Sequence, residues 1–292
     1  MILNFGSINV DYVYQLAHVP GAGETVHALS HEKHLGGKGV NQSIAIARSG
    51  GNVVHVGAVG TDGQWALDQI NQFGIDTSSI EKVQTSTGHA VILLEENGEN
   101  RIVIDAGANF QLTHAQIDRH LASTEPSGNW VLLQNETNLT SYIVNSAREQ
   151  GFSIAYAAAP FVASTTLGLL EKIDFLAVNE GEAIQLSNEL GVGPEEIPVD
   201  QLLITRGSNG SILISGDKRL EQSAFTVKPV DTTGAGDTFL GAFLALHDAG
   251  DPAEECLRFA SASSAIQVTR NGAAPAIPTR EEVNEFLQEH AN

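Results

Sequence analysis

The segment Val230–Phe239 reads Val-Asp-Thr-Thr-Gly-Ala-Gly-Asp-Thr-Phe and places the carboxylate of Asp237 directly after a glycine turn. Apolar residues follow at helical spacing, so a helix is expected to begin at this turn. Open amides at a helix N-terminus bind anions, and a carboxylate beside a phosphate is unfavourable unless it takes up a proton. Asp237 is therefore a candidate base for a hydroxyl that attacks phosphorus. A helix cap formed by Asp237 or Thr238 is the alternative.

A second glycine turn, Gly36–Gln42, reads Gly-Gly-Lys-Gly-Val-Asn-Gln. Its spacing fits neither a P-loop nor a dinucleotide fingerprint. Glycines allow the backbone to approach a ligand closely, and Lys38 and Asn41 supply groups that suit sugar hydroxyls. A tight strand-to-helix turn without a ligand is the alternative.

Polar side chains also stand at the ends of expected strands. Asn9 and Asp11 are two residues apart on an extended segment, so both face one side and suit neighbouring hydroxyls, unless they form an Asx turn. Asn179 and Glu182 begin a helix and could order water around Mg²⁺, or could simply cap the helix. The segment Thr205–Gly210 is either a nucleotide-contacting loop or a hairpin turn.

These motifs need a scaffold of alternating strands and helices. Apolar runs that read as buried strands are Val53–Val59, Trp130–Gln134, Ile154–Ala157, Phe175–Val178 and Leu202–Thr205. Amphipathic runs that read as helices are Gly39–Arg48, Trp65–Phe73, Ser141–Gln150, Glu180–Leu190 and Ala253–Val268. The alternation predicts an α/β sandwich of three layers around a mostly parallel sheet, with ligands beyond the carboxyl ends of its strands.

Two regions depart from this alternation. Thr25–Leu35 is extended and polar, and the strand-like runs Ala90–Leu94 and Arg101–Asp105 are joined by Glu96-Asn97-Gly98-Glu99, a strong hairpin signal. We expect one α/β domain over residues 1–292, with a small inserted β-sheet formed by residues 10–35 and 88–105. Such a sheet must close over a ligand or pair with another chain.

Composition narrows the classes of function. The 292 residues are 42% hydrophobic, which is ample for a large core, and the net charge of −20 argues against nucleic-acid and membrane partners. Cys256 cannot form an internal disulfide, and polar residues interrupt Met1–Tyr14, so a cytoplasmic protein is expected.

Taken in order, the motifs resemble the ribokinase-like (PfkB-type) carbohydrate kinase family over nearly the whole chain. The segments that carry the resemblance are Gly6–Asp11, Pro20–Val26, Gly36–Asn41, Ala106–Asn109, Asp231–Asp237 and Val268–Ala273. The resemblance implies ATP-dependent phosphorylation of the terminal hydroxymethyl group of a sugar, with D-ribose the leading acceptor. It also implies a homodimer formed through the inserted sheet.

The resemblance assigns roles at matching positions. Asp237 would be the base, and the amides of Gly234, Ala235 and Gly236 would form an anion hole. The sugar would contact Asn9, Asp11, Gly37, Lys38, Asn41, Glu136 and Asp237. ATP and Mg²⁺ would be held by Asn179, Glu182, Thr205, Arg206, Gly207, Ser208, Asn209, Gly210, Gly236 and Ser261. A monovalent cation, usually K⁺, would lie near Asp231, Thr233, Gln267, Arg270 and Gly272.

The chain departs from the family pattern at three places. Ala157 stands where an asparagine is usual, Ala276 replaces a common serine near the cation site, and Asn135 precedes Glu136 where leucine is usual. The identity of the sugar therefore stays open. Alternatives are a fructokinase, a 2-keto-3-deoxygluconate kinase, a nucleoside kinase, or a non-catalytic sugar or nucleotide sensor.

Overall fold

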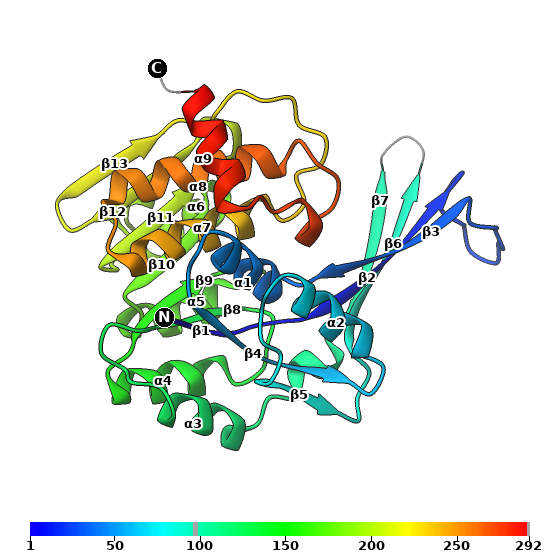
Figure 1. Ribbon diagram of the computed structural model, residues 1–292, viewed down its shortest axis with the longest axis horizontal. Helices are drawn as coiled ribbons and strands as arrows, with labels where there is room; N and C mark the ends of the chain where they lie inside the picture. Colours follow the sequence, from blue (N-terminus) through cyan, green and yellow to red (C-terminus); the bar gives the residue numbers. More distant parts are fainter. Residues whose placement is uncertain (96–98, 291–292) are drawn as a thin grey trace.

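The computed structural model describes residues 1–95 and 99–290, which form a large sheet between helices and a small sheet that projects from one side (Figure 1). Within these residues the large sheet has the order β13-β12-β11-β10-β9-β8-β1-β4-β5. Its strands are β1 (Ile2–Phe5), β4 (Val53–Gly60), β5 (Ile80–Val83), β8 (Trp130–Gln134), β9 (Ser153–Ala157), β10 (Phe175–Asn179), β11 (Gln201–Thr205), β12 (Ser211–Ser215) and β13 (Lys218–Gln222). From β5 to β11 the neighbouring strands are parallel, and β12 and β13 add an antiparallel edge.

Helices cover both faces of the large sheet and bury its apolar side chains. One face packs against α3 (His114–Ala122), α4 (Thr140–Gln150), α5 (Ala163–Leu169) and α6 (Glu180–Leu190). The other packs against α1 (Lys38–Arg48), α2 (Gln64–Gln72), α7 (Ala235–Ala249), α8 (Ala253–Gln267) and α9 (Arg280–Glu289). Short 3-10 turns lie at η1 (Gly107–Phe110), η2 (Leu170–Lys172), η3 (Pro194–Glu196), η4 (Gly207–Asn209) and η5 (Ala274–Ala276).

The predicted three-layer α/β sandwich is confirmed, with strand and helix ends that differ from the expected ones by about one residue. The predicted motifs follow the carboxyl ends of β1, β8, β10 and β11, and those ends meet at one edge of the sheet because the strands are parallel. The fold therefore gathers side chains that are far apart in the sequence.

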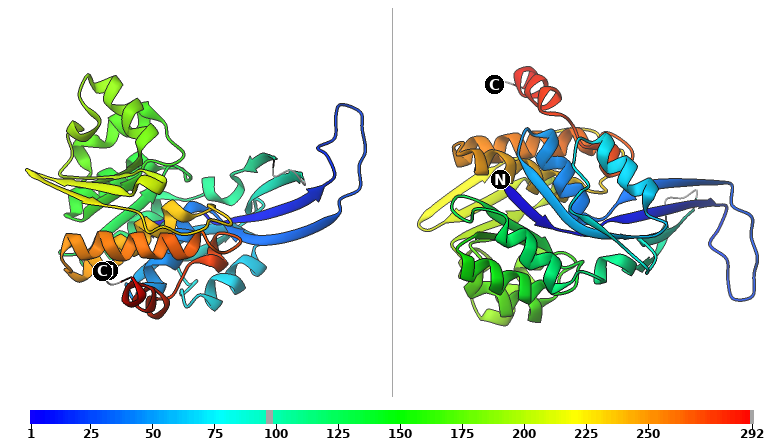
Figure 2. Two further views of the ribbon diagram at one scale, coloured as in Figure 1. Left: turned by 90° about the horizontal axis from the view of Figure 1, so that it is seen from above. Right: turned by 60° about the horizontal axis from the view of Figure 1, so that its bottom comes forward.

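The small sheet, here called the lid sheet, has the strand order β3-β2-β6-β7 (Figure 2). Its strands are β2 (Asn9–Leu16), β3 (Ser30–Gly36), β6 (Gly88–Glu95) and β7 (Asn100–Asp105). β6 and β7 pair antiparallel, as the hairpin prediction required, although the turn residues Asn97 and Gly98 lie outside the described residues. β3 occupies only the second half of the extended segment Thr25–Leu35.

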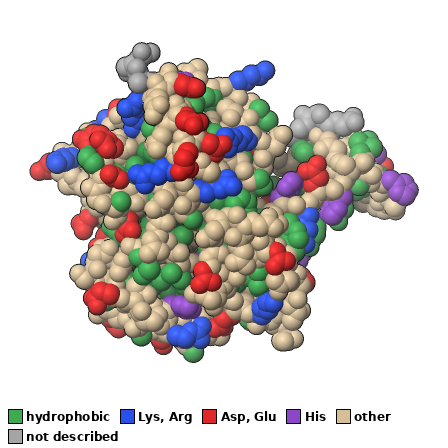
Figure 3. All heavy atoms as spheres, viewed as in Figure 1, with side chains coloured by type: hydrophobic (Ala, Val, Ile, Leu, Met, Phe, Trp, Pro, Cys, Tyr) green, Lys and Arg blue, Asp and Glu red, His purple; other side chains and the backbone are tan. Residues whose placement is uncertain are grey.

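Strand β7 is the exposed edge of the lid sheet. Ile102, Val103 and Ile104 keep 51%, 69% and 62% of their surface exposed, which is unusual for three consecutive large apolar residues. Histidine side chains gather on the projecting part of the molecule, whereas acidic and basic side chains are mixed over the main body (Figure 3). No helix within the described ranges is long and apolar enough to cross a membrane.

Candidate active site

Asp237 lies in the first turn of α7, after Gly234, which adopts a positive φ of 76° and begins the helix without a side-chain cap. The Asp237 carboxylate instead reaches across to α1, where Asn41 Nδ2 donates to Oδ2 at 3.2 Å and Gln42 Nε2 donates to Oδ1 at 2.9 Å. The capping alternative for Asp237 is therefore wrong. Burial raises the pKa of Asp237 to about 6, although Lys38, Gln42 and Asn41 lower it. A carboxylate with such a pKa suits general-base catalysis.

A chain of buried amides fixes the orientation of Gln42. Gly39 O, which can only accept, takes a hydrogen bond from Asn4 Nδ2 at 2.7 Å, so Asn4 Oδ1 must face Gln134. Gln134 Nε2 then donates to Asn4 Oδ1 at 2.9 Å and to Gln42 Oε1 at 2.6 Å. Asn4, Gln42 and Gln134 are at most 1% exposed. The Gln42 N–H group is therefore directed at Asp237 by partners that do not titrate.

The glycine turn before α1 makes room for a carboxylate from the lid sheet. A Cβ on Gly36 would lie 2.2 Å from Asp11 Oδ2, and Gly37 adopts a φ of 100° against the backbone of Ser7 and Asn9. Burial raises the pKa of Asp11 to about 6, a shift that His34 opposes and Glu136 supports. The structure thus brings Asp11 beside the glycine turn Gly36–Gln42.

The remaining predicted sugar residues are tied into the same turn. Asn9 is 8% exposed, and its Oδ1 accepts a hydrogen bond from Asn109 Nδ2 at 2.7 Å. Glu136 accepts hydrogen bonds from the Lys38 backbone N–H at 2.9 Å and from the Ser7 hydroxyl. Glu136 therefore stabilises the N-terminal end of α1, and one of its oxygens already has both protein partners.

A cavity of about 210 Å³ adjoins Asp237 and gathers the predicted phosphate residues. Lys38, Glu182 and Asp237 line it together with Ala157, one of the residues that depart from the family pattern. Asn179 and Glu182 form a reciprocal capping box, in which Glu182 N donates to Asn179 Oδ1 at 2.9 Å and Asn179 N donates to Glu182 Oε2 at 2.8 Å. The capping alternative is confirmed for this pair, and the cap places the Glu182 carboxyl at the cavity wall.

A second, larger cavity of about 430 Å³ continues from the first. The two share Thr205, Thr232, Ala235 and Gly236, so an elongated ligand can pass from one to the other along the glycine turn. The larger cavity is lined by Thr205, Gly207, Ser208, Gly210, Ala224, Phe225, Thr226, Val227, Pro229, Thr232, Ala235, Gly236, Phe239, Ser261, Ser264, Ala265 and Val268. Its mainly apolar wall fits the flat ring of a nucleotide base. The end that it shares with the smaller cavity leads to Asp237, the candidate general base.

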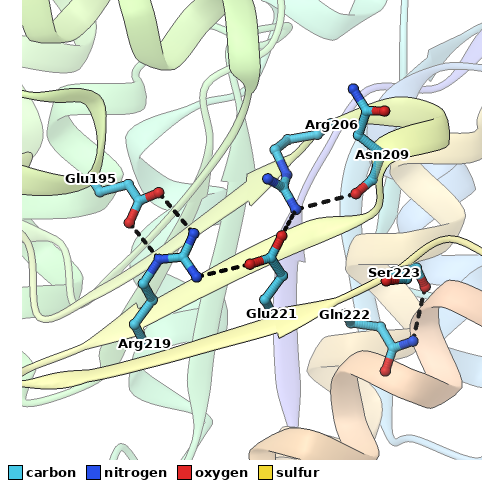
Figure 4. Close-up of polar contacts among 7 residues, drawn as sticks. All are labelled: Glu195, Arg206, Asn209, Arg219, Glu221, Gln222 and Ser223. Carbon is cyan, nitrogen blue, oxygen red and sulfur yellow. Dashed lines mark hydrogen bonds and ion pairs between the residues drawn. The ribbon is translucent and has the colours of Figure 1, made fainter.

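Arg206 and Asn209 were predicted to contact the nucleotide, but neither lines either of these two cavities. Arg206 turns away from the cavity, and its Nη2 donates to Glu221 Oε1 at 2.5 Å and to Asn209 O at 3.2 Å (Figure 4). Arg219 joins Glu221 to Glu195 in the same network. Arg206 therefore braces the loop, while Gly207, Ser208 and Gly210 face the ligand space.

Comparison with known proteins decides the family. The model of the pfkB family of carbohydrate kinases matches residues 1–280. The chain belongs to this family. Ribokinase from Haemophilus influenzae is 34% identical over 302 residues, covering 98% of this chain and 97% of the relative. Ribokinase from Bacillus subtilis is 36% identical over 288 residues and 97% of both chains.

The fold of this family member agrees with a solved structure of ribokinase from Arabidopsis thaliana complexed with ribose and ATP. The TM-score is 0.86 at 30% identity, and the match covers 98% of this chain and 97% of the other. The chain is therefore a carbohydrate kinase by family, with a site whose geometry can be compared with that activity.

Hydrogen bonds made by side chains join the two loops that were expected to bind a monovalent cation, one before α7 and one after α8. Asp231 Oδ1 accepts from Thr233 N and Oδ2 from Gly272 N, each at 2.9 Å. Gln267 lies between the same loops, and its Nε2 donates to the carbonyl oxygens of Thr233 and Gly272. The Arg270 guanidinium turns away from this point and pairs with Glu282 at 2.7 Å.

Sequence reasoning missed several residues of this kinase site. Gln42 and Asn109 donate hydrogen bonds to the predicted residues Asp237 and Asn9, and Gln134 orients Gln42. The segment 224–229 supplies much of the larger cavity wall. Gln42 directly follows the predicted Asn41 and lies in the same helix turn, which is the one local signal. The segment 224–229 has no helical or strand periodicity to mark it.

Proposed function

We propose that the protein transfers the γ-phosphoryl group of ATP to the terminal hydroxymethyl group of a sugar, with D-ribose as acceptor and D-ribose 5-phosphate as product. The observation that carries the proposal is the placement of Asp237 on the wall of the smaller of two contiguous cavities, with its carboxylate oriented by Gln42 and Asn41. The similarity to ribokinases supports the choice of sugar. The family membership supports the choice of reaction.

In this mechanism the protein orients reactants and balances charge. Asn9 and Asp11 hold the sugar against the glycine turn so that its hydroxymethyl group faces Asp237. Asp237 takes the proton as the sugar oxygen attacks the γ-phosphorus. The amides of Gly234–Gly236 and the Lys38 ammonium face the charge that develops on the transferred group.

Magnesium is part of the proposed activity. The Glu182 and Asp237 carboxyl groups line the smaller cavity, and Mg²⁺ is commonly held by one or two carboxylates, water and substrate phosphates. Glu182 would hold the ion through water, with Asn179 keeping the carboxyl in place. When bound, the ion would neutralise charge on the phosphates.

The resemblance to the family also implied K⁺. The residues around Asp231 do not fit a monovalent cation, because the partly positive Gln267 Nε2 group already donates to the Thr233 and Gly272 carbonyl oxygens, two of those expected around the ion. The proposed activity therefore does not include K⁺.

We further propose one kinase domain over residues 1–292, with lid segments 10–35 and 88–105, that forms a homodimer through the lid sheet. The exposed apolar strand β7 supports the dimer, because a second copy would remove Ile102, Val103 and Ile104 from water. A consumer of ATP would act in the cytoplasm, where ATP is available.

Asp237→Asn tests the catalytic role. We expect kcat for D-ribose to fall by about 10²–10⁴-fold, the usual contribution of a general base, while calorimetry detects retained binding of sugar and ATP. The matched control is Asp118→Asn, which changes an exposed carboxylate on α3 and leaves turnover unchanged.

Two outcomes would contradict different parts of the proposal. Undiminished turnover in Asp237→Asn would remove the base. Turnover of fructose, 2-keto-3-deoxygluconate or a nucleoside, but not D-ribose, by the wild-type protein would remove the sugar assignment and leave the reaction class.

A further inference from the structure

Gln267 is the last residue of α8 and is fully buried between the loop that leads into α7 and the loop that follows α8. Its Nε2 lies within hydrogen-bond distance of three backbone carbonyl oxygens, those of Thr233 at 2.9 Å, Ala273 at 3.1 Å and Gly272 at 3.3 Å, and shares its two N–H groups among them. Carbonyl oxygens that converge on one point are the kind of ligand set that replaces the hydration shell of K⁺. Here the point is taken by an amide nitrogen of the chain itself.

The orientation of the Gln267 amide is fixed by its partners. Its Oε1 accepts from the Thr238 hydroxyl at 2.9 Å. If the amide were flipped, its oxygen would face the three carbonyl oxygens, which have no hydrogen to donate. The partly positive N–H groups must therefore point into the carbonyl cluster, where a cation would be repelled from the same position.

The loops joined by Gln267 position the anion hole. Gly234 begins α7, and a Cβ added to it would lie 3.3 Å from Gln267 Nε2 and 3.0 Å from Ala273 Cβ. Asp231 ties the same loops by accepting from Thr233 N and Gly272 N. Ala276, near the second loop, has no hydroxyl that could ligate an ion. The side chains of Asp231 and Gln267 thus join the two loops by hydrogen bonds.

We propose that the Gln267 side-chain amide takes the place of the monovalent cation, so that this kinase orders its anion-hole loop without K⁺. The proposal rests on the proposed sugar kinase activity. It differs from the expectation raised by the family resemblance, because the site is occupied by a side chain and completed by hydrogen bonds.

The first experiment measures turnover of D-ribose with the Tris salt of ATP and Mg²⁺ in the absence of Na⁺ and K⁺. KCl is then exchanged for choline chloride at constant ionic strength. We expect the wild-type rate and melting temperature to be the same in the two salts. A several-fold increase in the wild-type rate that is specific to KCl would overturn the proposal.

Gln267→Ala gives the reverse expectation. Removing the amide leaves the carbonyl cluster without its donor, so we expect kcat to fall about tenfold, equal to ~1.4 kcal/mol, and KCl to restore it in part. The melting temperature of this variant should rise in KCl, since an ion that binds only the folded state stabilises it. Ala276→Ser in the Gln267→Ala background should strengthen the response to K⁺ by adding a hydroxyl ligand.

Gln116→Ala is the matched control. Gln116 is also a buried glutamine, and its Nε2 donates to a backbone carbonyl, that of Gly57 at 2.9 Å, away from the site. This variant should keep wild-type kcat and show no response to K⁺. A folded Gln267→Ala variant that behaves like Gln116→Ala would overturn the proposal, and the wild-type comparison decides if Gln267→Ala does not fold.

The proposed function can fail separately. If the wild-type protein phosphorylates no sugar, the kinase assignment fails, while the melting temperatures in KCl and choline chloride still report on the carbonyl cluster. A wild-type melting temperature raised by KCl alone would then overturn the role of Gln267.

Discussion

Asp237 on the body of the molecule and Asp11 on the lid sheet both have a pKa raised by burial to about 6, yet their partners differ in kind. Asp237 is held by the amides of Gln42 and Asn41, which carry no titratable proton. Asp11 lies opposite His34 on the neighbouring strand, and the charge of His34 lowers the pKa of Asp11. We call the Asp237 side of the site the body wall and the Asp11 side the lid wall. The carboxylate of the body wall is oriented by neutral hydrogen-bond donors, whereas that of the lid wall is paired across the strands with a histidine.

The two walls also differ in burial. Asn4, Gln134 and Gln42 form their chain inside the core, whereas strand β7 at the edge of the lid sheet is exposed along its whole length. The proposed chemistry therefore lies in the buried body of the molecule, and the proposed closure or pairing involves the exposed lid sheet. The following variants each change one of these two walls, so that their effects can be compared.

The largest effect is expected for Gln42→Leu, which removes a donor from the base on the body wall. A hydrogen bond to a charged group contributes roughly 1.5–3 kcal/mol, so kcat should fall about 10- to 100-fold. Because the Gln42 donor lowers the pKa of Asp237, its loss raises that pKa further. The acidic limb of the kcat profile should therefore move to higher pH, which a pH series from 5 to 9 would measure.

The charged neighbours that act on Asp237 in this variant are unchanged, namely Lys38, which lowers its pKa, and Glu136, which raises it. Gln116→Leu is the matched loss of a buried amide and should leave both kcat and the pH profile as in the wild type. An unshifted acidic limb in folded Gln42→Leu would show that Gln42 does not position the base.

A smaller effect is expected at the exposed edge of the lid wall. Ile104 pairs with Ala90, which pairs with Asp11, so its side chain lies on the same side of the lid sheet as Asp11. In the proposed dimer, Ile104→Asp places a charge in an apolar contact. We expect the dimer dissociation constant to rise roughly 30-fold, as for ~2 kcal/mol at an interface hot spot, in sedimentation at micromolar concentration.

Val103→Asp provides a control on the same strand, because Val103 faces the opposite side of the sheet. If only Ile104→Asp weakens the dimer, the contact between subunits lies on the Asp11 side of the lid sheet. If both variants weaken the dimer equally, the contact is made by the edge of β7. A wild-type protein that sediments as a monomer would contradict the dimer.

The difference between the walls also explains how far the sequence could predict them. Asn9, Asp11, Asn179 and Thr205 follow a simple local rule, since polar residues and glycines at the ends of parallel strands meet at one edge. The fold class could be predicted from the alternation of strands and helices, which is likewise visible in local sequence patterns. These are patterns that a single segment carries by itself.

What the sequence could not predict depends on contacts between distant segments. Gln134 and Gln42 are 92 residues apart, and nothing in either segment indicates that one amide orients the other. Arg206 is drawn away from the larger cavity by Glu221, 15 residues later, with which it pairs. Gln267 ends an ordinary helix, and its role appears only when the carbonyls of two loops surround it.

The smallest effect is expected for His34→Ala on the lid wall. Protonated His34 lowers the pKa of Asp11, so its removal should raise that pKa and let Asp11 gain a proton at higher pH. The groups that face His34 are Glu32, whose Oε2 lies 2.9 Å from Nε2, Asp11 and Asp231, and Glu136 also acts on Asp11. At pH 8, about two units above the pKa of Asp11, the Asp11 carboxylate is ionised in the variant and the wild type alike, so both should bind the sugar equally.

Near pH 6 we expect the KM for D-ribose to rise by about fivefold or less in His34→Ala, because a partly exposed charge interaction contributes at most about 1 kcal/mol. kcat should follow the wild-type pH profile, since the pKa of Asp237 is set on the other wall. His34→Gln, which keeps a polar side chain without the charge, should behave like His34→Ala. A pH-dependent change in kcat rather than KM would show that the two carboxylates titrate as one unit, and the separation of the walls would then be wrong.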